Sequence, residues 1–345
     1  MRAVAYSGYG VTPELTEVAD PVCPADGVVI AIGATGVCRS DWHAWQGHDP
    51  VALPHIGGHE FAGVVAATGP EVTRWQAGDR VTVPFACGCG QCAYCLAGDA
   101  QVCPRQTQPG FTGPGAFAEL VAVHAADANL VSLPSSVDFV TAACLGCRFA
   151  TAFRAVTAHG RVRAADWLAV HGCGGVGLSA VMIASALGAR VVAVDVAPAA
   201  LDAARALGAE VTVDAGAGGD LPAAVGEITG DGAHVSIDAL GSAAVAANSV
   251  RCLRRRGRHI QVGLLPEGSV PLPMDLVIAR EIEIYGSHGM AARDYPAMMR
   301  LVADGTLRPG LLVGDVIALE DTGRALAAMS EVSATAGMTV VRLAA

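Results

Sequence analysis

The sequence predicts an α/β protein of two domains, in which an irregular β-rich part precedes a doubly wound parallel sheet. Its 345 residues are typical of about two domains. The first 150 residues are rich in Gly, Pro and short β-branched runs, whereas buried strands alternate with helices from about residue 150. Such alternation indicates parallel strands joined by right-handed crossover helices.

The elements follow one another in a clear order. Short strands are expected at 28–32, 63–67, 80–84 and 120–123. Farther along, strands are expected at 164–170, 190–194, 210–213, 235–239 and 259–263, with helices at 176–187 and 198–207. The segments 315–319, 321–329 and 338–343 return to a mixed β/α pattern.

The composition of the chain argues against binding to nucleic acid or to membranes. The chain has 22 basic and 32 acidic side chains, a formal charge of −10, which opposes binding to nucleic acid or to anionic membranes. The uncharged stretch 167–189 is long enough to cross a bilayer, but glycines interrupt it, so a buried strand, turn and helix is expected there. We therefore expect a cytoplasmic protein whose 11 cysteines are reduced unless they bind metal.

A glycine-rich loop joins the strand at 164–170 to the helix that follows it. Its glycines match the G-x-G-x-x-G pattern in the strand–turn–helix context that a pyrophosphate-binding loop requires. The loop residues concerned are Gly172, Gly174, Gly175, Val176 and Gly177. A purely structural glycine turn is the alternative.

Asp195 ends the next expected strand, 23 residues after Gly172. A carboxylate at this position accepts hydrogen bonds from ribose hydroxyls and repels a 2′-phosphate, so NAD is favoured over NADP. A run of arginines farther along could bind phosphate, but it is more typical of a solvated helix end. That run consists of Arg251, Arg254, Arg255, Arg256 and Arg258.

Four closely spaced cysteines predict a structural zinc site. Cys89, Cys92, Cys95 and Cys103 have spacings of three, three and eight residues, which suit a closed tetrahedral set of thiolates. Disulfides are the alternative, and a reducing compartment opposes them. Cys87 lies two residues before Cys89 and is an alternative fourth ligand.

A second, dispersed set consists of Cys38, His59 and Cys147. Each alone is more often a core or surface residue than a ligand, and His48 and His55 nearby show that histidine density proves little. Together they offer two thiolates and one imidazole, which is the ligand type of a catalytic zinc with an open fourth position.

These ordered motifs resemble the zinc-dependent alcohol dehydrogenases of the medium-chain dehydrogenase/reductase family over nearly the whole chain. The resemblance rests on Cys38, the His59-Glu60 pair, the four-cysteine segment, Cys147, and the glycine loop with Asp195. It implies a GroES-like β-rich catalytic, zinc-binding domain formed by 1–148 and 288–345. It also implies a dinucleotide-binding Rossmann domain over 149–287.

The resemblance further assigns roles around the catalytic zinc. Cys38, His59 and Cys147 match its ligands, and Cys144 is a competitor for the third position. Glu60 matches a residue beside the metal that approaches it during ligand exchange. Asp41 matches the carboxylate that orients the histidine ligand, in the usual carboxylate–His–zinc arrangement.

Proton transfer, substrate and cofactor contacts are implied in the same way. Ser40 matches the hydroxyl that takes the proton of the alcohol, and His43, with an ordinary pKa near 6.5, passes it through the cofactor ribose to solvent. Phe85 and Trp42 are placed near the substrate. The expected cofactor contacts are Arg39 on the pyrophosphate and Val262, Gly263 and Leu264 on the nicotinamide amide.

The expected activity is hydride transfer between an alcohol and NAD, with two zinc ions per chain, interconverting alcohols with aldehydes or ketones. Alternatives are a related zinc dehydrogenase acting on polyols or aldehyde hydrates, and a non-catalytic zinc-binding interaction module. Cys147 favours simple alcohols, because polyol-active relatives often have a glutamate near this position. A homo-oligomer is expected, with a tetramer favoured over a dimer. At Gly337-Met338 many relatives have Gly-Arg, so an arginine contact to the pyrophosphate is expected to be absent.

Overall fold

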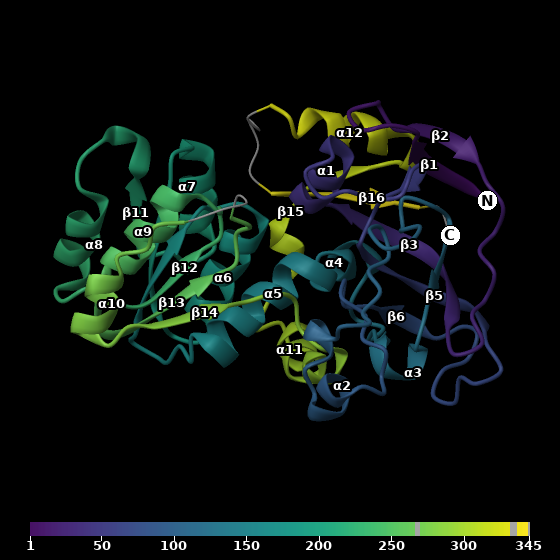
Figure 1. Cartoon of the computed structure of the whole chain (residues 1–345), viewed down its shortest axis with the longest axis horizontal. Helices are drawn as coiled ribbons and strands as arrows, with labels where there is room; N and C mark the ends of the chain where they lie inside the picture. Colours follow the sequence, from purple (N-terminus) through teal and green to yellow (C-terminus); the bar gives the residue numbers. More distant parts are fainter. Residues whose placement is uncertain (266–269, 332–336, 344–345) are drawn as a thin grey trace. The chain divides into compact units, whose positions relative to one another are not determined.

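The computed structural model describes residues 1–265, 270–331 and 337–343 (Figure 1). The chain divides into two compact units. The first comprises Met1–Ala150 and the described C-terminal residues from Gly289 onward, and the second comprises Thr151–His288. Both ends of the chain therefore belong to the first unit.

Two sheets form the first unit. The smaller has the strand order β2-β1-β4, and the larger has the order β15-β16-β3-β5-β6-β8, with β7 paired to β3. The strands are β1 (Arg2–Tyr6), β2 (Glu14–Glu17), β3 (Val28–Val37), β4 (His55–Ile56), β5 (Glu60–Thr68), β6 (Arg80–Thr82), β7 (Leu120–Val123), β8 (Val131–Ser132), β15 (Val313–Ile317) and β16 (Met338–Arg342).

The long strand β3 organises the larger sheet. It pairs with β5, β7 and β16, and nearly all its residues are buried. The expected strand over 28–32 is therefore five residues too short at its end. Its extension matters because β3 ends at Val37, directly before Cys38.

Short helices connect the strands of the first unit. Cys38 is the N-cap of α1, and Gly47, with a φ of 79°, ends it. The helices are α1 (Arg39–Gln46), α2 (Ala93–Ala97), η1 (Ala100–Val102), α3 (Ala126–Asn129), α4 (Phe139–Ala143), the π-helix η2 (Leu145–Phe149), η5 (Ala292–Asp294), α11 (Tyr295–Ala303), η6 (Pro309–Leu312), η7 (Leu319–Asp321) and α12 (Thr322–Ala328).

The second unit is built on one parallel sheet of order β11-β10-β9-β12-β13-β14. Its first strand along the chain lies inside the sheet, so the chain winds outward in both directions, and the predicted doubly wound sheet is confirmed. The strands are β9 (Trp167–His171), β10 (Arg190–Asp195), β11 (Val211–Asp214), β12 (Ala233–Asp238), β13 (Leu253–Gln261) and β14 (Glu283–Gly286).

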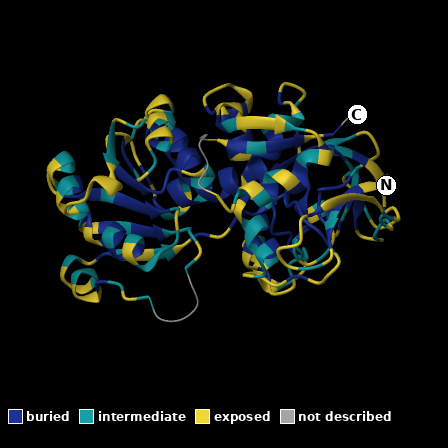
Figure 2. Cartoon of the chain, turned by 90° about the horizontal axis from the view of Figure 1, so that it is seen from above, coloured by how far each residue is buried: buried dark blue, intermediate teal, exposed yellow. Residues whose placement is uncertain are grey.

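Helices follow the strands of this sheet in the alternating pattern that the sequence predicts. Their outer surfaces are exposed, and the central strands β9, β10 and β12 are largely buried (Figure 2). The helices are α5 (Ala150–Arg154), which begins at the boundary of the units, the π-helix η3 (Ala155–His159), α6 (Gly175–Ala186), α7 (Pro198–Ala206), η4 (Ala215–Ala217), α8 (Leu221–Thr229), α9 (Ala243–Arg251) and α10 (Met274–Arg280).

The arginine run is not a helix end, and that prediction is wrong. Only Arg251 belongs to a helix, α9, whereas the other four arginines lie in β13. Two of these arginines have partners that follow β13 in the chain. The Arg255 guanidinium donates to the Ala279 carbonyl, and Arg256 forms an ion pair with Glu281. Arg255 and Arg256 are exposed within β13, whereas Leu253, Gly257, His259 and Ile260 of the same strand are buried, so these arginines lie in the sheet and not at a helix terminus.

The apolar segment at 167–189 forms β9, the glycine loop and α6. Across the described part of the chain, no helix is both long enough and apolar enough to span a membrane.

Candidate functional site

Three dispersed residues meet at the end of β3. The Cys38 and Cys147 sulfurs and a His59 ring nitrogen all lie within 4.8 Å of one another. Strand pairing explains the approach, because Gly36 in β3 faces Glu60 in β5, which places Cys38 and His59 at neighbouring strand ends. Cys147 comes from the π-helix η2, a type of turn that is frequent at functional sites.

Asp41 orients two of these three residues. Its Oδ1 lies 2.7 Å from His59 Nδ1 and accepts the Gly58 N–H at 3.1 Å. Its Oδ2 accepts the Cys38 N–H at 3.0 Å. His59 Nε2 is then left buried with no hydrogen-bond partner. A nitrogen orphaned in this way beside two thiols fits a metal ion, and the donor set suits Zn²⁺.

The electrostatics of this set are strongly coupled. A hydrogen bond with Cys147 lowers the pKa of Cys38 well below its ordinary value although burial opposes this shift. The same hydrogen bond, together with burial, raises the pKa of Cys147. Burial lowers the pKa of His59, but the Asp41 carboxylate outweighs it and raises that pKa well above its usual range. A metal would replace the thiol proton held between the sulfurs, because zinc binds thiolates.

Glu60 contacts an arginine rather than lying free beside the three donors. Its Oε1 accepts the Arg148 backbone N–H at 2.8 Å, and its Oε2 accepts the Arg148 Nε–H at 2.8 Å and contacts Nη2. Both side chains are buried. Sequence analysis did not identify Arg148. A basic residue that directly follows a candidate ligand in an apolar stretch could have indicated a buried ion pair near the metal site.

Aromatic rings surround His59. The Phe85 ring lies edge-on to it at a centroid distance of 6.0 Å, and the Phe111 ring lies at 5.0 Å. Phe85 was expected here, whereas Phe111 was missed because its loop position gives no sequence signal. Ser40 is also close, with its Oγ 4.0 Å from the Cys38 sulfur.

The other predicted residues of α1 have partners of their own. His43 Nδ1 lies 3.1 Å from His48 Nδ1, and the Trp42 ring is edge-on to both imidazoles. Burial, with the nearby His48 and Arg39, lowers the pKa of His43 below the ordinary value that the sequence suggested. Arg39 contacts the Met329 carbonyl and lies over the Trp42 ring at 4.8 Å.

The alternative ligands lie elsewhere. The Cys144 thiol is buried and donates to the Val140 carbonyl, and the Cys87 thiol donates to the Pro84 carbonyl. His55 is buried with its Nε2 2.8 Å from the Gly110 carbonyl oxygen, and His48 is exposed. None of these residues belongs to either group of candidate metal ligands found in the described chain.

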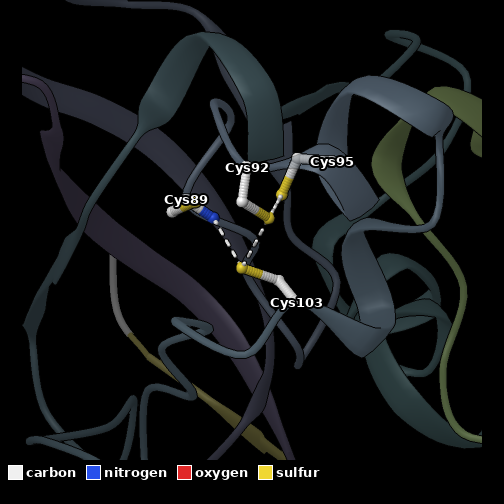
Figure 3. A group of neighbouring side chains, drawn as sticks. All are labelled: Cys89, Cys92, Cys95 and Cys103. Carbon is white, nitrogen blue, oxygen red and sulfur yellow. Dashed lines mark hydrogen bonds between the residues drawn. The ribbon is translucent and has the colours of Figure 1, made fainter.

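The four-cysteine group is assembled around α2 and η1 (Figure 3). All four sulfurs lie within 4.8 Å of one another, with Cys92 Sγ at 3.5 Å from Cys95 Sγ and 3.6 Å from Cys103 Sγ. Tetrahedral zinc with Zn–S bonds of about 2.3 Å sets sulfurs roughly 3.8 Å apart, so the spacing fits.

Neighbouring donors favour the thiolate form of Cys89 and Cys103, whereas burial raises the pKa of Cys95 to about 12. The Arg105 guanidinium donates to Cys89 Sγ at 3.3 Å, and its backbone N–H donates to Cys103 Sγ at 3.3 Å. A hydrogen bond from the Gln91 backbone lowers the pKa of Cys89 to about 6. All 11 cysteines are free thiols, so the disulfide alternative is not supported.

In the second unit, the glycine loop lies at the carboxyl end of β9. Gly172 has a φ of 89°, which favours glycine, and a Cβ on Gly177 would lie 1.8 Å from the Gly172 carbonyl oxygen. A Cβ on Gly174, in contrast, would meet nothing within 4 Å. Open space at the N-cap of α6, beside first-turn amides that lack helical acceptors, fits a bound pyrophosphate.

Asp195 ends β10 next to this loop. Its Oδ2 accepts the Cys173 N–H at 2.6 Å, and its Oδ1 accepts the N–H groups of Val196 and Ala197. These bonds fix the carboxylate at the sheet edge where an adenosine ribose binds in doubly wound folds.

Residues 262–264 follow β13 and are fastened to β12. The N–H groups of Val262 and Gly263 both donate to the Asp238 carbonyl, and the Gln261 amide bridges the Asp238 carboxylate and the Gly263 carbonyl. Leu264 is exposed. Asp238 and Gln261 were missed by sequence analysis, because nothing in the local pattern shows that their side chains meet.

Comparison with known proteins finds relatives over most of the chain. Residues 24–135 match the model of the alcohol dehydrogenase GroES-like domain, and 175–304 match that of the zinc-binding dehydrogenases. A curated alcohol dehydrogenase of Geobacillus stearothermophilus is 33% identical over 311 residues, which are 89% of this chain and 90% of that protein.

Solved structures show the same likeness. An NAD-dependent alcohol dehydrogenase is 30% identical with a TM-score of 0.89, and all of both chains is covered. A chain from Sinorhizobium meliloti 1021 bound to NADP is 27% identical, also with a TM-score of 0.89, and 99% of each chain is covered.

The fold and the two cysteine-containing sites thus define a zinc-binding, nicotinamide-dependent oxidoreductase. The chain belongs to the zinc-dependent alcohol dehydrogenases of the medium-chain dehydrogenase/reductase family. The predicted family and class of activity are confirmed, and the non-catalytic zinc-binding alternative is set aside.

Proposed function

We propose that this protein is an NAD-dependent alcohol dehydrogenase with one catalytic and one structural zinc per chain, interconverting simple alcohols with aldehydes or ketones. The observation that carries the proposal is the convergence of Cys38, His59 and Cys147, with His59 Nε2 buried and unpartnered. Three protein donors leave a coordination place for substrate, whereas the four thiols of Cys89, Cys92, Cys95 and Cys103 close their site.

The residues around the three donors have separate roles in the reaction. Bound zinc supplies Lewis acidity toward the substrate oxygen. Asp41 fixes the tautomer of His59 by holding its Nδ1, so that Nε2 faces the metal position. The Phe85 and Phe111 rings, which both lie against the His59 ring, exclude water from the apolar part of a substrate.

Ser40 and His43 carry the proton. The Ser40 hydroxyl takes the alcohol proton as it releases its own, and the His43 imidazole passes a proton on to solvent. The lowered pKa of His43 keeps this imidazole neutral near neutral pH, so it has a free nitrogen lone pair that can accept a proton. Trp42 packs edge-on against His43 and limits the positions of its ring.

Cofactor binding is assigned to the second unit. The loop Gly172–Gly177 and the first turn of α6 bind the pyrophosphate, and the backbone groups of Val262–Leu264 that Asp238 and Gln261 leave unbonded bind the nicotinamide amide. Asp195 favours NAD because its carboxylate accepts ribose hydroxyls and repels a 2′-phosphate. Arg39, which interacts with Met329 and Trp42, is the proposed pyrophosphate contact from the first unit.

The proposal also covers the roles of the two domains, the assembly of the chain and the class of substrate. We assign the catalytic zinc-binding role to 1–148 and 288–345, and dinucleotide binding to 149–287. A cytoplasmic homo-oligomer, with a tetramer favoured over a dimer, fits the free thiols and the family resemblance. The acidic charge of −10 supports a small-molecule substrate rather than nucleic acid or a membrane. Cys147 as third ligand favours simple alcohols over polyols.

An activity survey tests the proposal. Zinc-replete protein with NAD and primary, secondary, aromatic and polyol alcohols is expected to form NADH, with the simple alcohols ahead of the polyols. The same panel with NADP measures cofactor preference. No NADH from any alcohol, and no NADH consumption with the matching aldehydes and ketones, would reject the proposed activity.

A further inference from the structure

The buried ion pair of Glu60 and Arg148 has no part in the mechanism above. Glu60 is 0% exposed and Arg148 is 7% exposed. The Glu60 carboxylate accepts the Arg148 backbone N–H and two guanidinium N–H groups, so both of its oxygens are occupied. Charged hydrogen bonds in this fork geometry fix both direction and distance.

The position of the pair is informative. Glu60 directly follows His59 at the start of β5, and Arg148 directly follows Cys147 in η2. The pair therefore joins two ligand-bearing segments that are 88 residues apart in the chain.

The third ligand-bearing segment packs against the same pair. A Cβ at Gly36, two residues before Cys38, would lie 2.7 Å from Glu60 Oε2 and 2.9 Å from Arg148 Nη2. The φ of Gly36 is not in the left-handed region, so space rather than backbone conformation requires glycine here. The segments that supply Cys38, His59 and Cys147 thus meet at one ion pair.

Stability alone is a poor explanation for such a pair. Two charges removed from water lose hydration energy that their attraction roughly repays, and apolar residues of similar volume often stabilise a protein equally well. What apolar side chains cannot reproduce is the fixed geometry of a doubly bonded carboxylate and guanidinium.

We propose that Arg148 is a positioning residue: through its ion pair with Glu60 it holds the three ligand segments at metal-binding spacing. This inference rests on the proposed function, because it concerns the catalytic zinc. It adds a second role for Glu60, which the family resemblance places beside the metal, because both of its oxygens accept hydrogen bonds from Arg148.

Zinc affinity measured by chelator competition tests the proposal without using activity. The decisive variants are Glu60→Met/Arg148→Met, which removes both charges together, and Gly36→Ala, which crowds the pair but keeps both charges. Loss of outer partners of metal ligands typically weakens binding about 10- to 100-fold, and we expect that loss at the Cys38 site in both variants. Thermal midpoints are recorded in parallel, because a merely structural pair would change the midpoint and leave zinc affinity as it is.

Two reference proteins make the result interpretable. Cys38→Ala identifies which of the bound zinc ions is being followed. Arg190→Met, which removes the exposed Arg190–Glu210 ion pair of the second unit, is expected to keep the wild-type zinc affinity. Wild-type affinity in both decisive variants would overturn the role of Arg148. If wild type itself bound no zinc that Cys38→Ala removes, the proposed catalytic metal site would fail instead.

Discussion

At the scale of single residues, backbone N–H groups fix the carboxylates that define the candidate binding positions. Asp41 occupies His59 Nδ1 and leaves Nε2 unpartnered. Asp195 is held by three backbone N–H groups at the edge of the glycine loop. In both places the backbone first fixes a carboxylate, and the carboxylate then defines a binding position.

Asp195→Ser tests the cofactor assignment at this scale. The serine lacks the negative charge that accepts ribose hydroxyls and repels a 2′-phosphate. A charged hydrogen bond contributes about 1.5–3 kcal/mol, so the ratio of kcat/KM for NAD over NADP should fall about 10- to 100-fold.

Asp214→Ser is the matched control, because Asp214 ends the neighbouring strand β11 opposite Asp195 and also accepts a nearby backbone N–H. Its NAD:NADP ratio should equal that of wild type. An unchanged ratio in Asp195→Ser would contradict the ribose role.

Residues whose side chains are typical metal ligands could be predicted from the sequence. Cys38, His59 and Cys147 were found because thiolates and imidazoles at these places suit a metal, and the structure brings them together. Arg148 and Gln261 could not be found in this way, because their roles depend on side-chain contacts across strands that no local pattern records.

At the scale of elements, the ends of strands carry the sites. β3 ends directly before Cys38, β5 starts directly after His59, and β9 ends at the glycine loop. Buried β-branched runs predicted β9, β10, β11 and β12 to within a few residues, because such runs are distinctive, whereas β13 was expected only over 259–263 and β14 was not predicted. The arginine run in β13 was taken for a helix end, because charge clustering says nothing about the neighbouring strand that buries its apolar positions.

Cys92→Ser tests the four-cysteine segment. A serine hydroxyl is a poor zinc ligand, so we expect bound zinc to fall by one ion per chain and protease cleavage within 89–103 to become faster. Zinc content and limited proteolysis measure these outcomes. Cys23→Ser is the control, because Cys23 is a half-buried thiol outside both ligand groups. Full zinc content in Cys92→Ser would be inconsistent with a structural zinc here.

His171 at the end of β9 makes folding sensitive to acid. Burial lowers the pKa of His171 to about 3 in the folded protein, against about 6.5 in an unfolded chain. As pH falls below 6.5, the unfolded chain binds a proton that the folded protein does not, so this contribution to stability is lost between about pH 6.5 and pH 3. The slope for one histidine approaches about 1.4 kcal/mol per pH unit.

His171→Leu should flatten the dependence of unfolding free energy on pH between 6.5 and 4.5 by about that slope, as measured by chemical denaturation. His124→Leu, which changes an exposed histidine near Asp26, serves as the comparison. A slope in His171→Leu equal to that of wild type would show that His171 does not titrate as burial requires.

At the scale of the whole molecule, the two units divide the chemistry. The first contains both groups of candidate metal ligands, and the second contains the parallel sheet with the glycine loop. The C-terminal strand β16 lies between β15 and β3 in the larger sheet, so the last described residues support the strand that leads to Cys38. Length and composition indicated two domains, the family resemblance implied that 288–345 returns to the first, and the pairing of β16 with β3 shows how it does so.

The central claim is that Cys38, His59 and Cys147 form the metal centre at which alcohol is oxidised. The most direct measurement determines zinc content and NADH formation together in Cys38→Ala and Cys147→Ala. Cys144→Ala is the control, because it removes a buried thiol three residues from Cys147 that is outside the ligand group. The account predicts that the first two variants fold, lose one zinc per chain and lose turnover, while Cys144→Ala keeps both zinc ions and activity. Full activity with undiminished zinc in Cys38→Ala would contradict it.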